Sequence, residues 1–444
     1  MPRATLSLMV VLMLAGCETT PRHAASTIPP ARLAASADSL THTTIAATLH
    51  EPIVPNHNVI WTASFQLAWD AQRREIGGDI DMVNQPLLAD QLNQSPIDAR
   101  RPLSDRWIAD AGPWIRSRIH SLRRRISEQF DDSASMKLLP DENPPMSGAM
   151  FMYACMIEQL KFEHPFDDLE PEWFTLNPTD ESDYATEPSF RYFGLDWYDP
   201  KSDHERALAE QIRILRHIDR TDDPMPEEDR GPSFMVELLT MSQTSRLILA
   251  CVPPRQSLDA TVKYVLQSIE KPNQLSLDEY KQRMQALSKD PKPDFDGDPE
   301  AFDRFLREKI YEPTNAVREL MDGESLRVPL IDFDLTQRYA ALCGKPIISN
   351  HPPINGLPFA DARQRVRFRL DRNGADVETE AAGTLFGGPM RHFEFTQPFL
   401  ILIIDRKTNL PDVAIWVGQH ELLVPSTPSP PPERDLFGEP QAAP

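Results

Sequence analysis

Cysteine, glycine and positive charge are all scarce in this chain of 444 residues. Four Cys are too few for a disulfide scaffold of this length. The 46 Lys and Arg against 67 Asp and Glu give a net charge of −21, which argues against a nucleic-acid surface because phosphate binding needs clustered positive charge. Pro outnumbers Gly by 43 to 17, and much of the proline lies near the two ends. Composition therefore indicates a soluble acidic protein and no particular activity.

The motifs of common catalytic and cofactor sites are missing as well. The chain has no GxGxxG, no GxxxxGK[ST], no HExxH and no GxSxG, and its eleven His stand at non-ligand spacings. Asp294, Asp296 and Asp298 resemble a calcium loop, but the glycine falls at the fourth position and Phe305 stands where a Glu is needed. We therefore expect no enzyme activity, no cofactor and no metal site.

The N-terminus has the pattern of a secretory signal. Arg3 precedes the apolar run from Leu6 to Ala15, which is too short to span a bilayer as a mature helix. The run ends in Leu14-Ala15-Gly16-Cys17, which resembles the lipobox of bacterial lipoproteins. The resemblance implies cleavage after residue 16, a lipid anchor at Cys17 and, because Glu18 follows, the outer membrane. The alternative is an ordinary secretory signal with an accidental cysteine.

Two segments have the composition of flexible chain. Residues 17–50 carry Ala, Ser, Thr and Pro with few large apolar groups, which predicts a tether. Residues 425–444 predict a Pro-rich disordered tail. The body between them, 51–424, has no visible repeat and is long enough for one large domain or two medium ones.

Helices and strands alternate irregularly in the body, which predicts an α+β fold. The apolar spacing predicts helices over 114–130, with Ile115, Ile119, Leu122 and Ile126 on one face, and over 258–270. Residues 58–70 begin as a strand and pass into a helix. Strands are predicted at 150–159 (buried on both faces), at 234–252 as a pair, at 326–333 before a short helix over 335–341, at 365–371, at 399–405 and at 413–418. Cys155 and Cys251 lie in such strands and are expected to be buried thiols.

The order of these segments resembles a serpin. NVIWTASF (58–65), MFMYACMIEQLKFEHPF (150–166) and LRVPLIDFDLTQRYAALCGK (326–345) are similar to segments of that family. The most specific part is 365–418, which resembles a central strand, hinge, reactive loop and terminal hairpin in their usual order. The resemblance implies a single domain with a large central mixed sheet, a second sheet and surrounding helices. It also implies a protease-inhibiting loop that is cleaved and inserts into a sheet as a strand.

Residues 374–391 have the properties of such a loop. Eighteen residues is long for a connection in a compact domain, and loops of that length are usually functional or disordered. The residues at alternate positions are small or β-branched, namely Ala375, Val377, Thr379, Ala381 and Gly383. Asp376, Glu378 and Glu380 would face the other way, so the segment could enter a sheet with its acids in solvent.

The resemblance places the cleaved bond in two ways. With Gly374 as the hinge glycine, the bond falls near Gly387-Gly388, behind Leu385-Phe386, and the target protease would prefer apolar residues. Matching Thr379-Glu380-Ala381-Ala382 to the hinge signature instead moves the bond towards His392. We favour the first register because counting back from Phe395 gives the same place.

The sequence also departs from the serpin pattern. Asp376-Val377-Glu378 interrupts the hinge, and the buried strand has Tyr153-Ala154 where the family has an Asn in its shutter. The N-terminal half is abbreviated. The segment 167–230 is long and acidic, and we interpret it as a solvated insertion rather than a binding site.

Five arginines on the predicted helix 114–130 allow two interpretations. Arg116, Arg118, Arg123, Arg124 and Arg125 could form a polyanion-binding face, which serpins are known to have. They could also be a solvated face that pairs with nearby acids, and the net charge favours this second interpretation.

Two functions remain open at this stage. The first is a serpin-like inhibitor of serine-type proteases, lipid-anchored outside the cytoplasm, monomeric, with a target protease as its partner. The second is a non-inhibitory module of serpin fold that binds a partner or has a structural role in the cell envelope. Neither function involves a nucleic acid.

Overall fold

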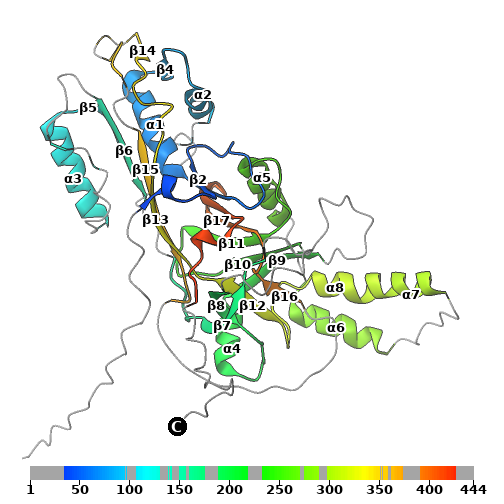
Figure 1. The fold of residues 1–444 in the computed structure, drawn as a ribbon. Coiled ribbons are helices and arrows are strands. Elements are labelled where there is room, and N and C mark those ends of the chain that lie inside the picture. The colour runs from blue at the N-terminus through cyan, green and yellow to red at the C-terminus, as the bar shows by residue number, and fades with distance from the viewer. Residues whose placement is uncertain are drawn as a thin grey trace, which may run out of the picture. The chain divides into compact units, whose positions relative to one another are not determined.

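A seven-stranded mixed sheet forms the centre of the computed structural model (Figure 1). The structure describes residues 35–95, 97, 107–130, 139, 141–142, 150–156, 160–175, 189–218, 233–270, 275–289, 298–350, 352, 354–358, 362–373 and 391–426. The strand order of the large sheet is β2 (Thr43–Ala46), β3 (Asn58–Thr62), β18 (Pro411–Val417), β17 (Phe399–Asp405), β11 (Ser245–Cys251), β10 (Ser233–Leu238) and β9 (Ile212–Ile218). β2 and β3 are parallel, and all other neighbours in this sheet are antiparallel.

Four smaller sheets surround it. A four-stranded sheet has the order β16 (His392–Glu394), β12 (Ser325–Pro329), β8 (Ser189–Leu195) and β7 (Asp167–Trp173). A three-stranded sheet has the order β1 (Ala35–Ser36), β13 (Ile331–Arg338) and β15 (Arg363–Leu370). β5 (Trp107–Pro113) pairs with β6 (Met150–Met156), and β4 (Asp81–Met82) pairs with β14 (Ile347–Ile348).

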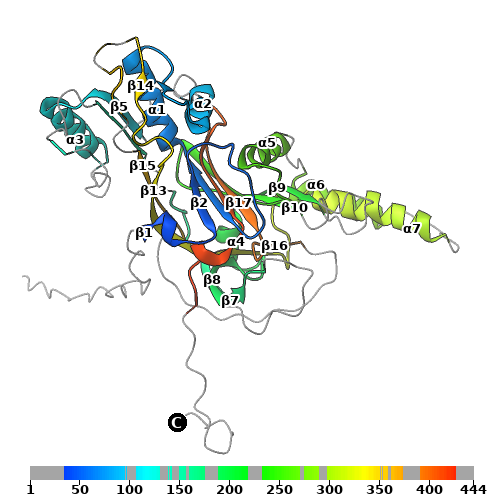
Figure 2. The ribbon, with the colours of Figure 1, turned by 45° about the horizontal axis from the view of Figure 1, so that its top comes forward.

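The helices are α1 (Ala63–Ile76), α2 (Leu87–Gln94), α3 (Arg116–Phe130), α4 (Asp203–Ala209), α5 (Leu258–Ile269), α6 (Leu277–Leu287), α7 (Pro299–Leu306) and α8 (Glu312–Asn315), with the π-helical turn η5 (Arg307–Tyr311) and the 3-10 turns η1 (Ala37–Ser39) and η6 (His420–Leu422). As drawn in Figure 1, α1, α2, α3 and α5 lie in the upper part of the molecule, and α4, α6, α7 and α8 lie in the lower part. α1 ends at Gly77, whose φ of 76° lets its N–H bond back to the carbonyls of Arg73 and Arg74. α6 and α7 extend away from the sheets and contain no fully buried residue (Figure 2).

The large sheet is buried on both faces. Every residue of β17 and β18 is buried, which is why these strands are nearly continuous apolar runs. Ile401 and Leu249 join one core together with β8, β12, β13 and β15, whereas Leu400 and Ile248 join a second core with α1 and α5. The alternation along each strand thus divides the hydrophobic side chains between two layers.

The α+β prediction is confirmed, together with most of the predicted elements. The strand-to-helix start at 58–70 is β3 and α1, the pair at 234–252 is β10 and β11, and the closing hairpin is β17 and β18. Pro329 ends β12, and the chain then enters a different sheet as β13.

Four details of the prediction are wrong. The short helix at 335–341 is absent, because β13 continues to Arg338 and pairs with β15 residue by residue. β6 is not buried on both faces, since only Phe151 and Tyr153 are buried, against α3. Ile115 precedes α3 and is 52% exposed, while the other three stripe residues are buried. The expected buried thiol is confirmed at Cys251, where burial raises the pKa to about 12, but Cys155 is half-buried.

The segment 167–230 is not a solvated insertion where the structure describes it. It supplies β7, β8, α4 and β9, which belong to the two larger sheets and their cover. The acidic residues of β7 mark it as an edge strand, with Leu169 packed against the core.

The tether is shorter than predicted. Residues 35–46 form β1, η1 and β2, and Ile45 and Ala46 are buried in the two cores. This segment folds although it has few apolar residues, because β2 forms backbone hydrogen bonds with the edge of β3. Residues 1–34, including Cys17, and 427–444 lie outside the described residues.

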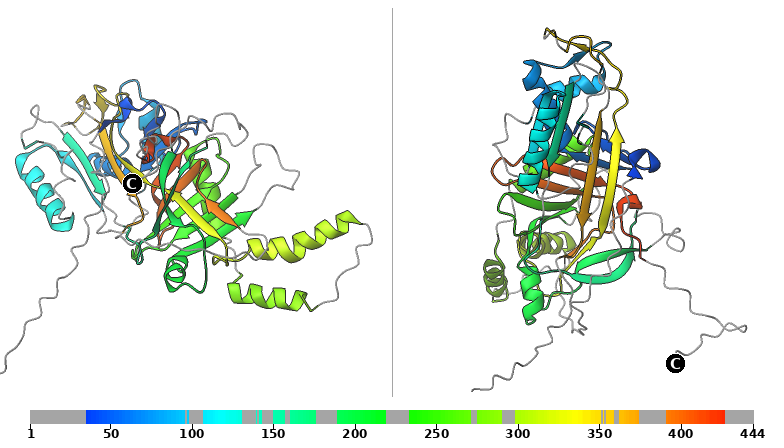
Figure 3. Two further views of the ribbon diagram at one scale, coloured as in Figure 1. Left: turned by 60° about the horizontal axis from the view of Figure 1, so that its bottom comes forward. Right: turned by 90° about the vertical axis from the view of Figure 1, so that its left-hand side faces the viewer.

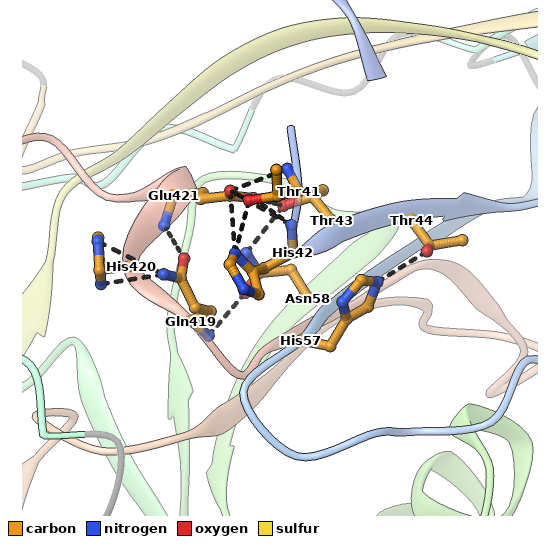
Figure 4. Close-up of polar contacts among 9 residues, drawn as sticks. All are labelled: Thr41, His42, Thr43, Thr44, His57, Asn58, Gln419, His420 and Glu421. Carbon is orange, nitrogen blue, oxygen red and sulfur yellow. Dashed lines mark hydrogen bonds and ion pairs between the residues drawn. The ribbon is translucent and has the colours of Figure 1, made fainter. Parts of the chain in front are cut away.

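A polar clasp fixes β2 to the end of β18 (Figure 4). The Glu421 carboxylate accepts hydrogen bonds from the Thr43 hydroxyl at 2.8 Å and from the backbone N–H groups of Thr41 and His42, each at 3.1 Å. The fully buried Asn58 donates to the Thr43 Oγ1 at 3.0 Å and accepts from the N–H groups of Gly418 and Gln419, each at 2.9 Å. The clasp satisfies the polar groups where three chain segments meet.

The clasp predicts an acid-dependent loss of stability. Burial alone would raise the pKa of Glu421, but the hydrogen bonds from Thr43, His42 and Thr41 outweigh it and hold that pKa below its ordinary value of 4.5. The stabilisation by the carboxylate is therefore present above about pH 4.5 and is lost as the pH falls further. Burial lowers the pKa of His57 from its ordinary value of 6.5. Protonation of His57 therefore causes a separate loss of stability, which begins at a higher pH than the loss from Glu421.

Urea unfolding of wild type and Glu421→Gln at pH 7 and pH 4 separates these two losses. We expect Glu421→Gln to lower the free energy of unfolding by about 1–2 kcal/mol at pH 7 and by less at pH 4, because the wild-type carboxylate has by then lost part of its stabilising effect. An equal difference between the two proteins at both pH values would contradict this account of the clasp.

Candidate functional site

The loop predicted from the sequence lies outside the described residues, but both of its ends are described. β15 and residues 371–373 precede it, and Arg391 and β16 follow it. The predicted loop residues that fall in this gap are Gly374, Ala375, Val377, Thr379, Glu380, Ala381, Ala382, Gly383, Leu385, Phe386, Gly387 and Gly388. The residues that hold the two ends of the predicted loop therefore define the candidate site.

A buried ion pair holds the downstream end. Arg391 and Glu324 have side chains that are 2% and 0% exposed, and they form two hydrogen bonds, Nε to Oε1 at 2.6 Å and Nη2 to Oε2 at 2.8 Å. The remaining guanidinium N–H groups donate to the carbonyls of Val317 at 2.8 Å and Glu319 at 2.9 Å. β16 then pairs in parallel with β12, starting at His392. The chain is thus fixed from its first described residue after the gap.

A second ion pair holds the upstream end. The Arg372 guanidinium donates to Asp168 of β7 at 2.8 Å, and the Arg372 carbonyl accepts from the N–H of Phe166 at 3.1 Å. The Asp371 carboxylate caps the turn by accepting from the N–H of Asn373 at 2.8 Å. Both ends of the loop are therefore tied to the four-stranded sheet, one through β7 and the other through β12.

β15 presents two chemically different faces. Val366 and Leu370 are buried in the main core, with Phe368 packed against it. The arginines that alternate with them, Arg363, Arg365, Arg367 and Arg369, lie on the opposite face. Asp334 of β13 accepts two hydrogen bonds from Arg365, one of them from Nε at 2.7 Å. Asp371 accepts one from Arg369 at 2.5 Å.

A buried polar network crosslinks β15 to α1. Gln364 takes an inward position on β15, and its Nε2 donates to the Thr62 hydroxyl at 2.8 Å and the Ser64 hydroxyl at 3.1 Å. The Tyr339 hydroxyl donates to the Gln364 Oε1 at 2.5 Å. Burial holds the pKa of Tyr339 far above its ordinary value, so this hydroxyl stays a donor. The sequence analysis missed this network, although a glutamine among inward-facing apolar residues was a visible signal.

We expect Gln364→Leu to lower the free energy of unfolding by about 1–3 kcal/mol, because the hydroxyls of Tyr339 and Thr62 lose a buried partner. Gln337 lies opposite Gln364 on β13 and donates only to the carbonyl of Arg338, so Gln337→Leu is the matched control. Guanidinium unfolding measures both variants. Equal midpoints for the two would show that the network contributes nothing to stability.

β15 and β6 lie next to each other without pairing. Figures 1 and 3 show the two strands side by side, and no pairing between them occurs among the described residues. α1 packs against β5 and β6 and is bonded to β15 through Gln364. Met152 of β6 packs in the same cluster as Tyr339 and Ala362, which flank β13 and β15. α1 therefore underlies two strands whose facing edges are unpaired.

Comparisons with known proteins give only structural neighbours. No family model and no curated protein sequence matches the chain. The similar solved structures are serpins. Thyroxine-binding globulin in complex with thyroxine has a TM-score of 0.40 and 10% identity, over 82% of this chain and 94% of that chain. Maspin gives 0.41 and 13%, over 82% and 93%, and a serpin from Schistosoma mansoni gives 0.33 and 13%, over 68% and 64%.

The arginines of α3 pair with acids, which favours the second of the two interpretations. Arg118 and Arg125 both contact Asp110, at 2.8 and 3.2 Å, and Arg123 contacts Glu142 at 3.0 Å. Arg116 and Arg124 have weaker partners in Glu142 and Glu128, at 3.8 and 3.7 Å. The geometry gives no support to the polyanion-binding face considered for a serpin-like protein.

No group of three or more His, Cys, Asp and Glu residues among the described residues could hold a metal ion. Within the described ranges, no helix combines the length and apolar character needed to cross a membrane.

Proposed function

We propose that this protein is a serpin-like inhibitor of serine-type proteases, displayed outside the cytoplasm on a lipid anchor at Cys17. The observation that carries the proposal is the environment of β15. Among the described residues this strand has one unpaired edge and a buried inward face, and the two ends of the predicted loop that follows it are held by ion pairs. Such a strand can accept another strand at its free edge.

The proposed mechanism begins when a protease attacks the loop near Gly387-Gly388. The serine oxygen of the protease bonds to the carbonyl carbon of residue 387, the peptide bond breaks, and the amine of residue 388 leaves with a proton. The residues before the cut, now attached to the protease as an ester, are free to add beside β15. Small residues at 375, 377, 379, 381 and 383 would face α1, and bulky ones would not fit there.

The order of elements supports this proposal. α1 follows β3 directly, β15 precedes the loop, and β16, β17 and β18 follow it as a short strand and a hairpin. This is the order on which the resemblance of residues 365–418 was based. β6 packs on α1, and β15 is bonded to Ser64 of α1 through Gln364, so a strand added at β15 would lie near α1.

A covalent complex tests the proposal. The full chain with Cys17→Ser, which removes the anchor, is incubated with elastase-type and chymotrypsin-type proteases and separated in SDS. We expect a band at the mass of the protease plus residues 1–387, because residues 388–444 separate in SDS, and this band must vanish when the protease is first acylated by an active-site inhibitor. Cleavage within 384–391 without such a band would rule out inhibition.

A non-inhibitory binding or structural module of the cell envelope is the alternative function. The network of Gln364, Thr62, Ser64 and Tyr339 favours it, because three buried side chains and the half-buried Ser64 fix β15 to the junction of β3 and α1. The small size of the β5–β6 sheet also limits how far the strands can rearrange. If this alternative is correct, the protease cleaves the loop and remains active.

The lipid anchor has its own test. Residues 1–40 are fused to a reporter, expressed with a labelled fatty acid, and compared with the Cys17→Ser variant. We expect label in the wild-type fusion and none in the variant. The same label in both fusions would remove the anchor from the proposal.

A further inference from the structure

Three arginines surround one buried carboxylate at an end of the large sheet. The side chain of Glu237 of β10 is 0% exposed. Arg246 of β11 donates two hydrogen bonds to it, from Nε to Oε1 at 3.0 Å and from Nη2 to Oε2 at 2.9 Å. Arg213 of β9 and Arg406, which follows β17, place their Nη1 atoms 3.7 Å from Oε2 and Oε1, respectively. We call these four residues the arginine cluster.

The strand register brings the cluster onto one face of the sheet. Arg213 lies directly opposite Glu237, which on its other side lies opposite Ile248. Arg246, two residues before Ile248, lies opposite Ile404. Both isoleucines belong to the core that the sheet forms with α1 and α5. Because residues two apart on a strand share a face, the cluster continues this face at the end where its apolar rows stop.

One arginine is enough to neutralise Glu237. A buried carboxylate needs a counter-charge and hydrogen-bond donors, and the two-bond fork of Arg246 supplies both. Arg213 and Arg406 are beyond hydrogen-bond distance, and among the described residues Glu237 is the only acid with which either forms an ion pair. The cluster therefore has two excess positive charges in a protein with a net charge of −21.

The two outer guanidinium groups are open to solvent. The side chains of Arg213 and Arg406 are 52% and 32% exposed, against 20% for Arg246. Within the described ranges, neither outer side chain donates a hydrogen bond to the protein. A guanidinium group presents five N–H donors in a plane that matches the oxygens of a phosphate group. The cluster thus offers unused donors and excess positive charge in one place.

We propose that the arginine cluster binds inorganic phosphate or a phosphate monoester. Such a group carries nearly two negative charges at pH 7, which matches the two excess charges of the cluster. The guanidinium groups of Arg213 and Arg406 donate to its oxygens, while Glu237 keeps its two hydrogen bonds from Arg246. The site lies on the large sheet, whereas both ends of the predicted loop are tied to the four-stranded sheet, so the proposal does not depend on protease inhibition.

Isothermal titration calorimetry with inorganic phosphate at low ionic strength tests the site. The protein is the full chain with Cys17→Ser, and we expect one phosphate per chain with a Kd of about 1 mM or below. Arg213→Gln and Arg406→Gln should each raise the Kd at least about 10-fold, which corresponds to about 1.4 kcal/mol. Arg124→Gln is the matched control and should leave the Kd unchanged, because Arg124 also lies 3.7 Å from a carboxylate, that of Glu128, but outside the cluster.

Three results would overturn the proposal. The first is the absence of phosphate binding by the chain with the intact cluster. The second is binding that neither Arg213→Gln nor Arg406→Gln weakens. The third is an equal loss of affinity in Arg124→Gln, which would show a general effect of charge. Circular dichroism at the temperature of the titration verifies that each variant is folded.

Phospholipid headgroups are a second source of phosphate. Sedimentation with phosphatidylglycerol vesicles compares the chain with its Arg213→Gln/Arg406→Gln double variant. We expect equal sedimentation of the two proteins, because this headgroup is a diester with a single negative charge. A clear loss of sedimentation in the double variant would overturn the assignment to a soluble phosphate and would give the cluster a lipid headgroup as its ligand.

Discussion

Replacing Glu324 by alanine is expected to lower the free energy of unfolding by about 3–5 kcal/mol. Glu324 and Arg391 are both buried, and removal of the carboxylate leaves the guanidinium without its counter-charge in a low-dielectric site. The N–H of Met321 and that of Arg391 also lose their acceptor, at 2.8 and 3.3 Å. Urea unfolding measures the loss. The downstream end of the loop should become susceptible to proteolysis at the same time.

Glu128→Ala is the control for this prediction. Glu128 and Arg124 of α3 are 3.7 Å apart, with side chains 68% and 72% exposed. Solvent screens such a pair, so its loss should change the free energy of unfolding by less than about 1 kcal/mol. If Glu324→Ala costs no more than Glu128→Ala, the buried pair does not anchor the loop.

Thr379→Arg is expected to abolish inhibition and to leave the loop cleavable. Residue 379 is in the middle of the segment proposed to add beside β15, and its side chain would point inward, to the face on which Val366 of β15 is buried in the core. A long charged side chain cannot enter that face without a partner, so the strand cannot form. We expect the covalent complex to fall at least about 100-fold, which corresponds to about 2.7 kcal/mol, while the protease still cuts the loop. SDS gels of a time course measure both products.

Glu380→Gln is the matched control, since residue 380 faces the other way and the substitution keeps its size. The Glu380→Gln variant should still form the covalent complex with the protease. Equal inhibition by Thr379→Arg and Glu380→Gln would exclude insertion with the proposed facing.

Local patterns were enough to predict β3, α1, β15 and the terminal hairpin, because their side chains repeat with the period of the element. They failed where pairing with a distant strand decides the structure. Residues 335–338 have a helical spacing, but β15 extends them as a strand. Residues 35–46 look like a tether, but β3, β13 and the Glu421 clasp give them partners.

The candidate site was predictable as a loop, but the groups that hold it were not. Arg391 and Glu324 are 67 residues apart and Arg372 and Asp168 are 204 apart, and nothing local marks them as pairs. Gln364 was the one visible irregularity, since it replaces an apolar residue at an inward position. Its partners at Thr62, Ser64 and Tyr339 come from elements that only the fold brings together.

The most direct test of the account is the stability of the wild-type chain before and after its loop is cut. The full chain with Cys17→Ser is cleaved within 384–391 by a protease, and the intact and cleaved forms are melted by calorimetry. Addition of a strand at the free edge of β15 buries further backbone and side chains, so we predict a cleaved form that melts at a clearly higher temperature. A cleaved form that melts at or below the temperature of the intact chain would contradict the insertion of the loop.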